Sequence, residues 1–440
     1  MSKGDDSQYS WARNGLDSMS LDWKWILGML VGWMGVVFFP SLFIGVAFFV
    51  LWCTASYRKW GWREAIVSLF LVSCVLANSR EVGMQYWKLL RLVAACFVLL
   101  EGWRVFVRSE PKLRSRWLIW LGLLGVCTVV PSLVSMDVED GILQSVLISS
   151  MWFSMVVLSH VPQGEPQHLR AQSLVHLGIV VIAISILSGV LQWPFAFLAG
   201  RFRGVFGNPN SISHWWLLFF ILGLSGTHSL RGPRSLVLVT FTLVVLYWAA
   251  SRGAALACLA ALIGWMLFRF QVSTVVKALL LLCIGGLFLG DQYSFRNHME
   301  EILPEHIVRA ETLEEGGGRF LAWEHALEEI MDSPWVGHGG GYEERFFDNS
   351  SSYFIKLNHQ GLSHNSWIAF AMNFGIPLSI LLIMGLLVFL RLHESKFWLI
   401  ALLPIVFSFS IEGYLTAPMS AISPALFFVG GFLGSFRAKK

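Results

Sequence analysis

Long apolar stretches recur along the chain and are separated by short polar turns. A helix needs about 20 mainly apolar residues to cross the hydrocarbon core of a bilayer, and many of these stretches approach that length. They predict helices at residues 23–39, 41–56, 64–77, 87–106, 117–134, 142–159, 174–193, 212–228, 235–250, 253–270, 275–289, 366–390, 397–411 and 422–436. The chain is therefore expected to be all-α, a polytopic integral membrane protein of about 12–14 transmembrane helices that forms a single multi-pass domain over residues 1–440.

One large polar segment, residues 291–365, interrupts this pattern near the C-terminal third. Within it, apolar residues at helical spacing predict an amphipathic helix at the membrane surface: Phe320, Trp323, Leu327 and Ile330. Pro334 ends that helix. The turn Gly337–Gly341 follows, and its glycines would let the backbone approach a ligand closely. It lacks the Gly-Lys-Ser/Thr of a nucleotide-binding Walker loop.

Composition supports the membrane class. The chain is 55% hydrophobic and 14% charged, and its mean hydropathy of +0.63 excludes an ordinary soluble domain. A net charge of +4 without a long basic block argues against nucleic acid as a partner. All six cysteines lie in apolar stretches without a Cys-x-x-Cys pair, so neither a disulfide framework nor a zinc site is predicted. Residues 1–22 lack the pattern of a cleaved signal peptide.

Basic residues gather in alternate loops, which orients the helices because cytoplasmic loops are enriched in Lys and Arg. The loops around residues 58–63, 104–116, 231–234 and 391–396 are basic and are assigned to the cytoplasm. The opposite side receives residues 137–140, 201–210, 251–253, the large loop 291–365 and Glu412. These loops are predicted to face the periplasm or the outside of the cell.

Three arginines break this rule, because Arg201, Arg203 and Arg252 lie on the less basic side without an adjacent carboxylate in the sequence. Guanidinium groups form bidentate hydrogen bonds that match phosphate oxygens. We therefore expect them to bind a lipid-linked phosphate or diphosphate. The alternative is that they reach lipid headgroups, or pair with loop glutamates near residues 311–315.

His364 lies just before a predicted membrane helix, in Ser363-His364-Asn365. An imidazole at the water edge of a cavity can take a proton from an attacking hydroxyl, and Asn365 could orient it or hold the acceptor. The alternative is that Asn365 or Ser363 simply caps the helix. A metal site formed by His338, His359 and His364 fits no common spacing, so neither a metal nor another cofactor is predicted.

These motifs together resemble the O-antigen ligase and O-antigen polymerase superfamily, which carries the Wzy_C domain. The residues that carry the resemblance are RGVFGNPN at 203–210, SRGA at 251–254, Gly318-Arg319 with Trp323, Ser333-Pro334 with Gly337, Gly339 and Gly341, and His364-Asn365. The corresponding ligase or polymerase region is expected at residues 200–380. The early helices match only in hydrophobicity, and fourteen predicted helices exceed the usual number of about twelve.

The resemblance implies a GT-C-like glycosyltransferase that uses an undecaprenyl-diphosphate-linked glycan as donor, with inversion and without a metal. It also implies a bacterial inner membrane as the location, with the active site facing the periplasm. The Asp-x-Asp of metal-dependent relatives is missing from the first outer turn, at residues 39–41. By position, Arg201, Arg203 and Arg252 would bind the diphosphate, Arg319 would hold the leaving group or donor sugar, and His364 would activate the acceptor. The remaining predicted substrate-binding residues are Asn210, Trp323, His338, Gly339, Gly341 and Asn365.

The acceptor separates the competing interpretations. A polymerase extends another lipid-linked unit, a ligase transfers the chain to lipid A-core, and a related oligosaccharyltransferase modifies protein. The Phe206-Gly-Asn208-Pro209-Asn210 turn favours a polymerase of O-antigen or exopolysaccharide. Expected partners include the bilayer and, besides donor and acceptor, a chain-length regulator or other assembly proteins. A transporter of lipid-linked oligosaccharide is the runner-up, although transporters place charges near the bilayer midplane and these predicted helices carry few.

Overall fold

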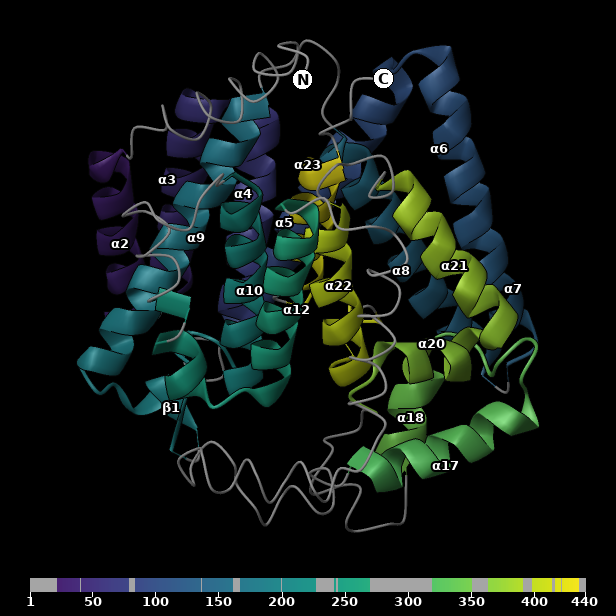
Figure 1. The fold of residues 1–440 in the computed structure, drawn as a ribbon. Coiled ribbons are helices and arrows are strands. Elements are labelled where there is room, and N and C mark those ends of the chain that lie inside the picture. Colours follow the sequence, from purple (N-terminus) through teal and green to yellow (C-terminus); the bar gives the residue numbers. More distant parts are fainter. Residues whose placement is uncertain are drawn as a thin grey trace, which may run out of the picture.

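The computed structural model describes residues 22–39, 41–78, 84–135, 137–160, 167–198, 200–226, 241–242, 244–269, 319–349, 363–390, 398–413, 416–420 and 422–434. The described chain is a bundle of helices that run side by side, with two further helices across one end (Figure 1). Four described helices are long and apolar enough to span a membrane: Leu42–Trp60, Pro111–Leu133, Val138–Ser159 and Gln172–Val190. The all-α, polytopic membrane class is confirmed, while the number of spans stays a prediction.

The bundle is built from the following helices. The N-terminal half contains α2 (Trp23–Phe38), α3 (Leu42–Trp60), α4 (Trp62–Ala77), α5 (Met84–Arg108), α6 (Pro111–Leu124), the π-helical turn η1 (Gly125–Val129), α7 (Val130–Leu133), α8 (Val138–Ser159) and α9 (Gln167–Val190). The second half contains α10 (Pro209–Gly226), α12 (Arg252–Arg269), α20 (Ser366–Phe374), α21 (Ile376–Phe389), α22 (Trp398–Ile411) and α23 (Ser423–Gly434). The predicted helix at 275–289 lies outside the described residues.

The predicted single helix at 366–390 is wrong, because the structure divides it into α20 and α21 at Gly375. Gly375 adopts a φ of 74°, which favours glycine, and Pro377 then occupies the first turn of α21. A Cβ on Gly375 would lie 2.5 Å from the carbonyl carbon of Trp335, so the segment that precedes the Gly-rich turn also needs this glycine. The apolar pattern runs through the break and therefore concealed it.

Two predicted helix starts are also corrected. The acidic turn at 137–140 is the beginning of α8, where the Asp137 carboxylate accepts a hydrogen bond from the amide of Asp140 and caps the helix. The helix predicted from residue 117 begins at Pro111, which occupies its first turn. Both starts are polar and precede the apolar stretch, so hydrophobicity alone places them too late.

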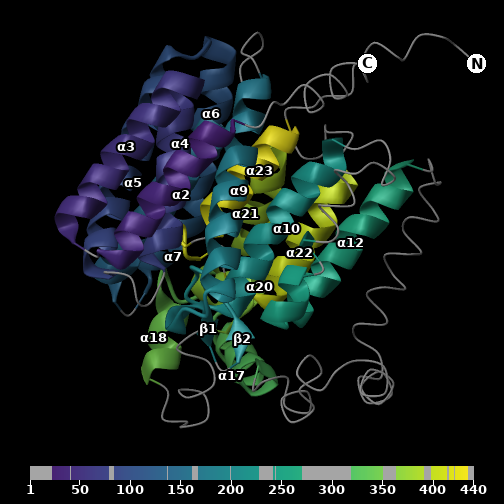
Figure 2. The same cartoon turned by 90° about the vertical axis from the view of Figure 1, so that its left-hand side faces the viewer.

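The large polar segment contains two described helices at the same end of the bundle as a short β-hairpin (Figure 2). The helix predicted around residues 320–330 is confirmed as α17 (Arg319–Asp332), which packs Ala322, Ala326 and Ile330 against α20. Leu327, predicted on the same apolar side, is exposed, and the position of the helix at the membrane surface stays a prediction. The second, α18 (Tyr342–Asn349), was not predicted, because it is short and mainly polar. The hairpin pairs β1 (Phe197–Leu198) with β2 (Arg201–Phe202) in antiparallel register.

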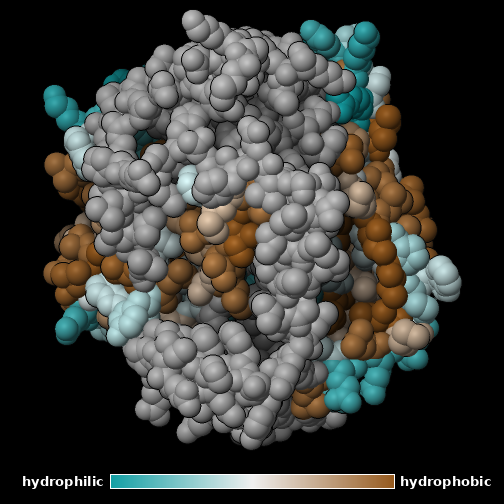
Figure 3. All heavy atoms as spheres, in the orientation of Figure 1, coloured by the Kyte–Doolittle hydropathy of each residue, from teal (hydrophilic) through white to brown (hydrophobic). Residues whose placement is uncertain are grey.

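The surface of the bundle carries exposed apolar side chains, as expected where lipid replaces water. Figure 3 shows them in brown along the right-hand side, over α6 and α7. They include Leu118, Ile119, Val126, Leu133 and Val134. Such a contiguous apolar surface would be an aggregation hazard in a soluble protein.

A buried ion pair joins α4 to α9. The Nε of Arg170 lies 2.6 Å from both carboxylate oxygens of Glu64, and its Nη1 donates to the carbonyl of Leu158 at 3.0 Å. Both side chains are almost completely buried. Removing one member would leave the other charge without compensation in a medium that solvates it poorly.

We therefore expect Glu64→Ala or Arg170→Ala to lower the free energy of unfolding by about 3–5 kcal/mol. Thermal unfolding of the purified protein in detergent measures the loss. The partly exposed Lys59–Asp22 pair is the matched control, and Lys59→Ala should cost only about 0–1 kcal/mol. Equal losses in the two pairs would contradict the role of burial.

Candidate active site

Segments that are distant in sequence meet at the end of the bundle where α10, α12 and α20 begin and α22 ends. Hydrogen bonds and an ion pair connect the hairpin, the residues before α12, the first turn of α10, the residue after α22 and the segment before α20. The amino ends of α10, α12 and α20 carry the positive ends of their helix dipoles. The site therefore favours negative charge.

Arg201 extends from the hairpin to the residues that precede α12. Its Nε donates to the carbonyl of Ala249 at 2.9 Å, and its Nη2 donates to the carbonyl of Ala250 at 3.2 Å and to Oδ1 of Asn210 at 2.8 Å. Ala250 has a φ of 46°, in the left-handed region that non-glycine residues rarely adopt. Arg201 thus fixes a strained turn directly before the Ser251-Arg252 motif.

Arg203 occupies a different environment. Its side chain is buried, and the guanidinium donates to the carbonyls of Phe195 at 2.7 Å and Gly207 at 3.3 Å. These bonds hold the turn between the hairpin and α10 together. A direct role of Arg203 in binding diphosphate stays a prediction.

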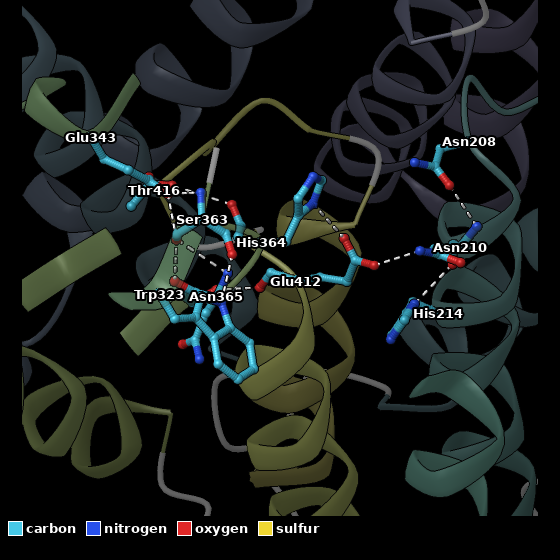
Figure 4. A network of polar contacts seen from close by, with 12 residues as sticks. Asn208, Asn210, His214, Trp323, Glu343, Ser363, His364, Asn365, Glu412 and Thr416 are labelled. Carbon is cyan, nitrogen blue, oxygen red and sulfur yellow. Dashed lines mark hydrogen bonds and ion pairs between the residues drawn. The ribbon is translucent and has the colours of Figure 1, made fainter. Parts of the chain in front are cut away.

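A chain of polar contacts leads from Arg201 to His364. Figure 4 shows its part from Asn210 through Glu412 to His364. The amide nitrogen of Asn210 donates to Oε1 of Glu412 at 2.7 Å, and Oε2 of Glu412 lies 3.5 Å from Nδ1 of His364. The backbone carbonyl of Glu412 accepts from the hydroxyl of Ser366 at 2.6 Å. The structure thus brings together Arg201, Asn210 and His364, three of the predicted site residues, around a buried carboxylate.

Glu412 was not among the predicted site residues. It is only 4% exposed, although it directly follows the apolar helix α22. A carboxylate at the end of an apolar helix is costly to bury without partners, so its position was a signal that pointed to a site.

His364 has a φ of 53°, so its backbone is also left-handed. Asn365 caps α20, because its Oδ1 accepts hydrogen bonds from the amides of Trp367 at 2.9 Å and Ile368 at 3.2 Å. The capping alternative considered for Asn365 is therefore what the structure shows. Contact of Asn365 with substrate stays a prediction.

Two helices of the large polar segment hold Ser363, the residue before His364. The amide and hydroxyl of Ser363 donate to Oε1 of Glu343 at 2.7 and 2.6 Å, and the indole of Trp323 donates to its carbonyl at 2.8 Å. Glu343 is 2% exposed, and this burial raises the pKa of its carboxyl. The predicted site residue Trp323 therefore contacts the histidine-bearing segment itself, and Glu343 is a second residue that the sequence pattern did not reveal.

We expect Glu343→Ala to lower turnover by about tenfold or more, because an unsatisfied buried Ser363 costs about 1–3 kcal/mol and releases the strained segment. Glu343→Gln keeps an acceptor oxygen and should retain most activity. Because the folded-state pKa of Glu343 is raised, its contribution to stability is fully present below the ordinary carboxyl pKa and is lost as pH rises through the raised value. Thermal unfolding across pH should therefore show this dependence in the wild type and not in Glu343→Gln. A pH dependence that is identical in both would contradict it.

The Gly-rich turn packs between helices. The amides of Gly339 and Gly340 donate to the carbonyl of Asn373 at 2.8 Å and to the hydroxyl of Ser132 at 2.9 Å. A Cβ on Gly339 would lie 2.7 Å from that of Ser135, so the glycine is needed for this close approach. Gly341 adopts a φ of 74°. Contact of Gly339 or Gly341 with a substrate stays a prediction.

His338 lies in the same turn and is held by α17 and α18. Its ring stacks on Tyr342, with 4.2 Å between centroids, and its Nε2 lies 2.9 Å from the carbonyl of Glu329. Arg345 of α18 also pairs with Asp140 at the start of α8. These contacts show that His338 helps to hold the polar segment against the bundle. A contact between His338 and a substrate stays a prediction.

For two further predicted site residues, Arg252 and Arg319, the structure describes only the position of the backbone. Arg252 is the first residue of α12 and follows the strained turn bound by Arg201, and Arg319 is the first residue of α17. Their side chains lie outside the described part of the structure. Within the described ranges, no group of three His, Cys, Asp or Glu side chains is arranged to hold a metal ion.

Comparison with known proteins supports the family resemblance. Residues 236–383 match a family model described as O-antigen ligase, Wzy_C. The match includes α12, α17, α18 and α20 with His364, but not Arg201, Asn210 or Glu412. No curated protein matches the chain. The predicted resemblance is confirmed: this multi-pass membrane protein carries a region of the O-antigen ligase and polymerase superfamily.

Proposed function

We propose that the protein is an inverting, metal-independent glycosyltransferase that moves an undecaprenyl-diphosphate-linked glycan onto a sugar hydroxyl. The observation that carries the proposal is the polar chain from Arg201 through Asn210 and Glu412 to His364. It joins an anion-binding guanidinium to a potential proton acceptor within one network. Both are needed for displacement of a diphosphate by a hydroxyl.

The donor diphosphate binds at the arginine end of this chain. Arg201 lies beside the amino ends of α10 and α12, where backbone amides and helix dipoles favour phosphate. Arg252 and Arg319 begin helices of the matched family region and are proposed to contact the diphosphate and the leaving group. The negative charge on the leaving diphosphate increases as the bond breaks, so fixed cations stabilise the transition state more than the ground state.

The acceptor hydroxyl binds at the histidine end. The acceptor oxygen forms a bond to the anomeric carbon while the bond between that carbon and the diphosphate oxygen breaks. The electron pair of the broken bond leaves with the diphosphate. The hydroxyl proton moves to Nε2 of His364. Because Nδ1 faces the Glu412 carboxylate, that carboxylate fixes the tautomer and stabilises the imidazolium that forms. A single direct displacement inverts the anomeric configuration.

Asn210 connects the two ends. Its amide nitrogen donates to Glu412 while its carbonyl oxygen accepts from Arg201, which determines the orientation of the amide. Asn210 therefore positions both groups and is not required to touch the substrate.

The proposed setting is the periplasmic face of a bacterial inner membrane, in O-antigen or exopolysaccharide assembly. We favour a polymerase, on the strength of the Phe206–Asn210 turn, over a ligase that transfers the chain to lipid A-core. The purified protein, incubated with an undecaprenyl-diphosphate oligosaccharide and acceptor, should release free undecaprenyl diphosphate without added metal. Absence of release with every acceptor class would contradict the proposal and favour the transporter.

Surface glycans of a deletion strain distinguish the acceptors. Loss of long chains with retention of core that carries a single unit indicates a polymerase. Loss of all capped core indicates a ligase.

A further inference from the structure

Only part of the apolar surface of helix α17 packs against the rest of the protein. Ala322, Ala326 and Ile330 pack on α20. The neighbouring arc of the same helix carries Leu327, which is 53% exposed, and Met331, which is 70% exposed. Among the described residues α17 thus presents a second apolar stripe that the bundle does not cover.

This stripe leads to a tryptophan at the start of the apolar helix α21. Trp335 is 75% exposed and follows Met331 by four residues. The carbonyl of the preceding Pro334 accepts a hydrogen bond from the amide of Ile376 at 2.8 Å, and the backbone of Trp335 packs against Gly375. Trp335 is therefore held at the first turn of α21.

The exposed side of α21 continues the same surface. Ile376, Ile380 and Met384 recur every four residues on this apolar helix, and all three are exposed. An apolar helix whose exposed side is also apolar fits acyl chains better than water. The stripe of α17 thus ends, at Trp335, beside a helix of this kind.

We propose that Met331 and Trp335 insert into the outer rim of the bilayer, at the boundary between headgroups and acyl chains, so that α17 rests on phospholipid. Tryptophan is enriched at this depth, because its ring is apolar and its indole N–H can still reach a polar partner. Glu324 and Glu328 lie on the adjoining exposed arc, which gives α17 the polar side that an interfacial helix keeps in water. Phospholipid is favoured over a second copy of the chain, because the stripe adjoins the exposed apolar side of α21.

The consequence concerns the height of the active site. Helix α17 carries Trp323, which holds the carbonyl of Ser363, so a helix that rests on lipid keeps His364 at a constant depth relative to the membrane surface. The effect on His364 depends on the proposed function, whereas the contact between α17 and lipid does not. An experiment can therefore refute either one without the other.

Spin labelling tests the contact. Met331→Cys, Trp335→Cys and Glu328→Cys are prepared singly in a variant with the six native cysteines replaced by alanine, labelled with a nitroxide and placed in nanodiscs of phosphatidylethanolamine and phosphatidylglycerol. Power saturation compares collisions with oxygen, which concentrates in lipid, and with a water-soluble nickel chelate. We expect oxygen to dominate at 331 and 335, as at an Ile380→Cys reference, and nickel to dominate at 328.

Two results would overturn the proposal. Nickel contact at 331 and 335 equal to that at 328 means that the stripe lies in water, and protection from both reagents means that protein, such as a second copy, covers it. If the cysteine-free variant does not fold, quenching by brominated lipids is measured instead, as the difference between the wild type and Trp335→Phe. We expect the wild type to lose more fluorescence, and equal quenching would refute the contact.

Discussion

Replacing His364 with asparagine should lower the turnover of undecaprenyl-diphosphate oligosaccharide by about 10²–10⁴-fold while the protein stays folded. The imidazole is the proposed proton acceptor, and the asparagine amide cannot take its place at neutral pH. Asparagine is also one of the few residues that adopt the left-handed backbone of position 364 readily. The substitution therefore removes the chemistry without adding backbone strain. Release of undecaprenyl diphosphate measures the effect.

Matched variants separate this effect from a structural one. His364→Ala should lose as much activity but also some stability, because alanine is strained at a φ of 53°. Glu412→Gln removes the charge that stabilises the imidazolium and keeps the size, so its loss should be smaller than that of His364→Asn. Near-normal turnover of His364→Asn would eliminate the proposed base, whatever Glu412→Gln shows.

The membrane helices could be predicted from the sequence because the apolar pattern alone determines them. The apolar pattern predicts which residues contact lipid, but it does not predict where the backbone turns within an apolar stretch. Gly375 shows the limit: it breaks a continuous apolar stretch because a neighbouring turn packs against it. Helix α18 shows the opposite case, since eight residues with several charges are too short for their apolar spacing to predict a helix.

A site residue could be predicted from the sequence where its side chain is of a type that is unusual at that position. Arg201 and His364 stand out because each is polar at the edge of an apolar stretch. Glu412 also ends an apolar stretch, but its link to the site comes from Asn210, which is 202 positions away and cannot be found from the local sequence. Glu343 lies in a short polar segment, where a carboxylate is not unusual. Arg203 is a case in which the sequence position suggested a phosphate ligand, whereas in the structure its guanidinium donates to two backbone carbonyls.

Both ends of the polar chain coincide with strained backbone. Ala250 and His364 are two of the three non-glycine residues with positive φ among the described residues. The carbonyl of Ala250 accepts a hydrogen bond from Arg201, and His364 is the proposed base. Such strain persists only when surrounding contacts enforce it. Arg201 enforces it at Ala250, and Ser363, held by Glu343 and Trp323, enforces it at His364.

Replacing Arg201 with methionine should lower kcat by about 10²–10³-fold, the usual cost of removing one preorganised donor from a site of developing negative charge. Methionine retains a long apolar stem and removes the guanidinium. Turnover at saturating donor gives kcat, and its dependence on donor concentration gives KM. Because the charge of the diphosphate grows in the transition state, the loss should appear in kcat more than in KM.

Arg201→Lys tests whether a positive charge alone suffices at position 201, and Arg203→Met is the control for effects on the fold. Lysine keeps the charge but cannot donate to Asn210 and to the carbonyls of Ala249 and Ala250 in the same planar arrangement, so it should restore little activity. Arg203→Met removes bonds to Phe195 and Gly207, so it should lower thermal stability more than Arg201→Met does. If Arg201→Met unfolds the protein as readily as Arg203→Met while the folded fraction keeps its kcat, Arg201 is a structural residue, and the diphosphate must bind elsewhere.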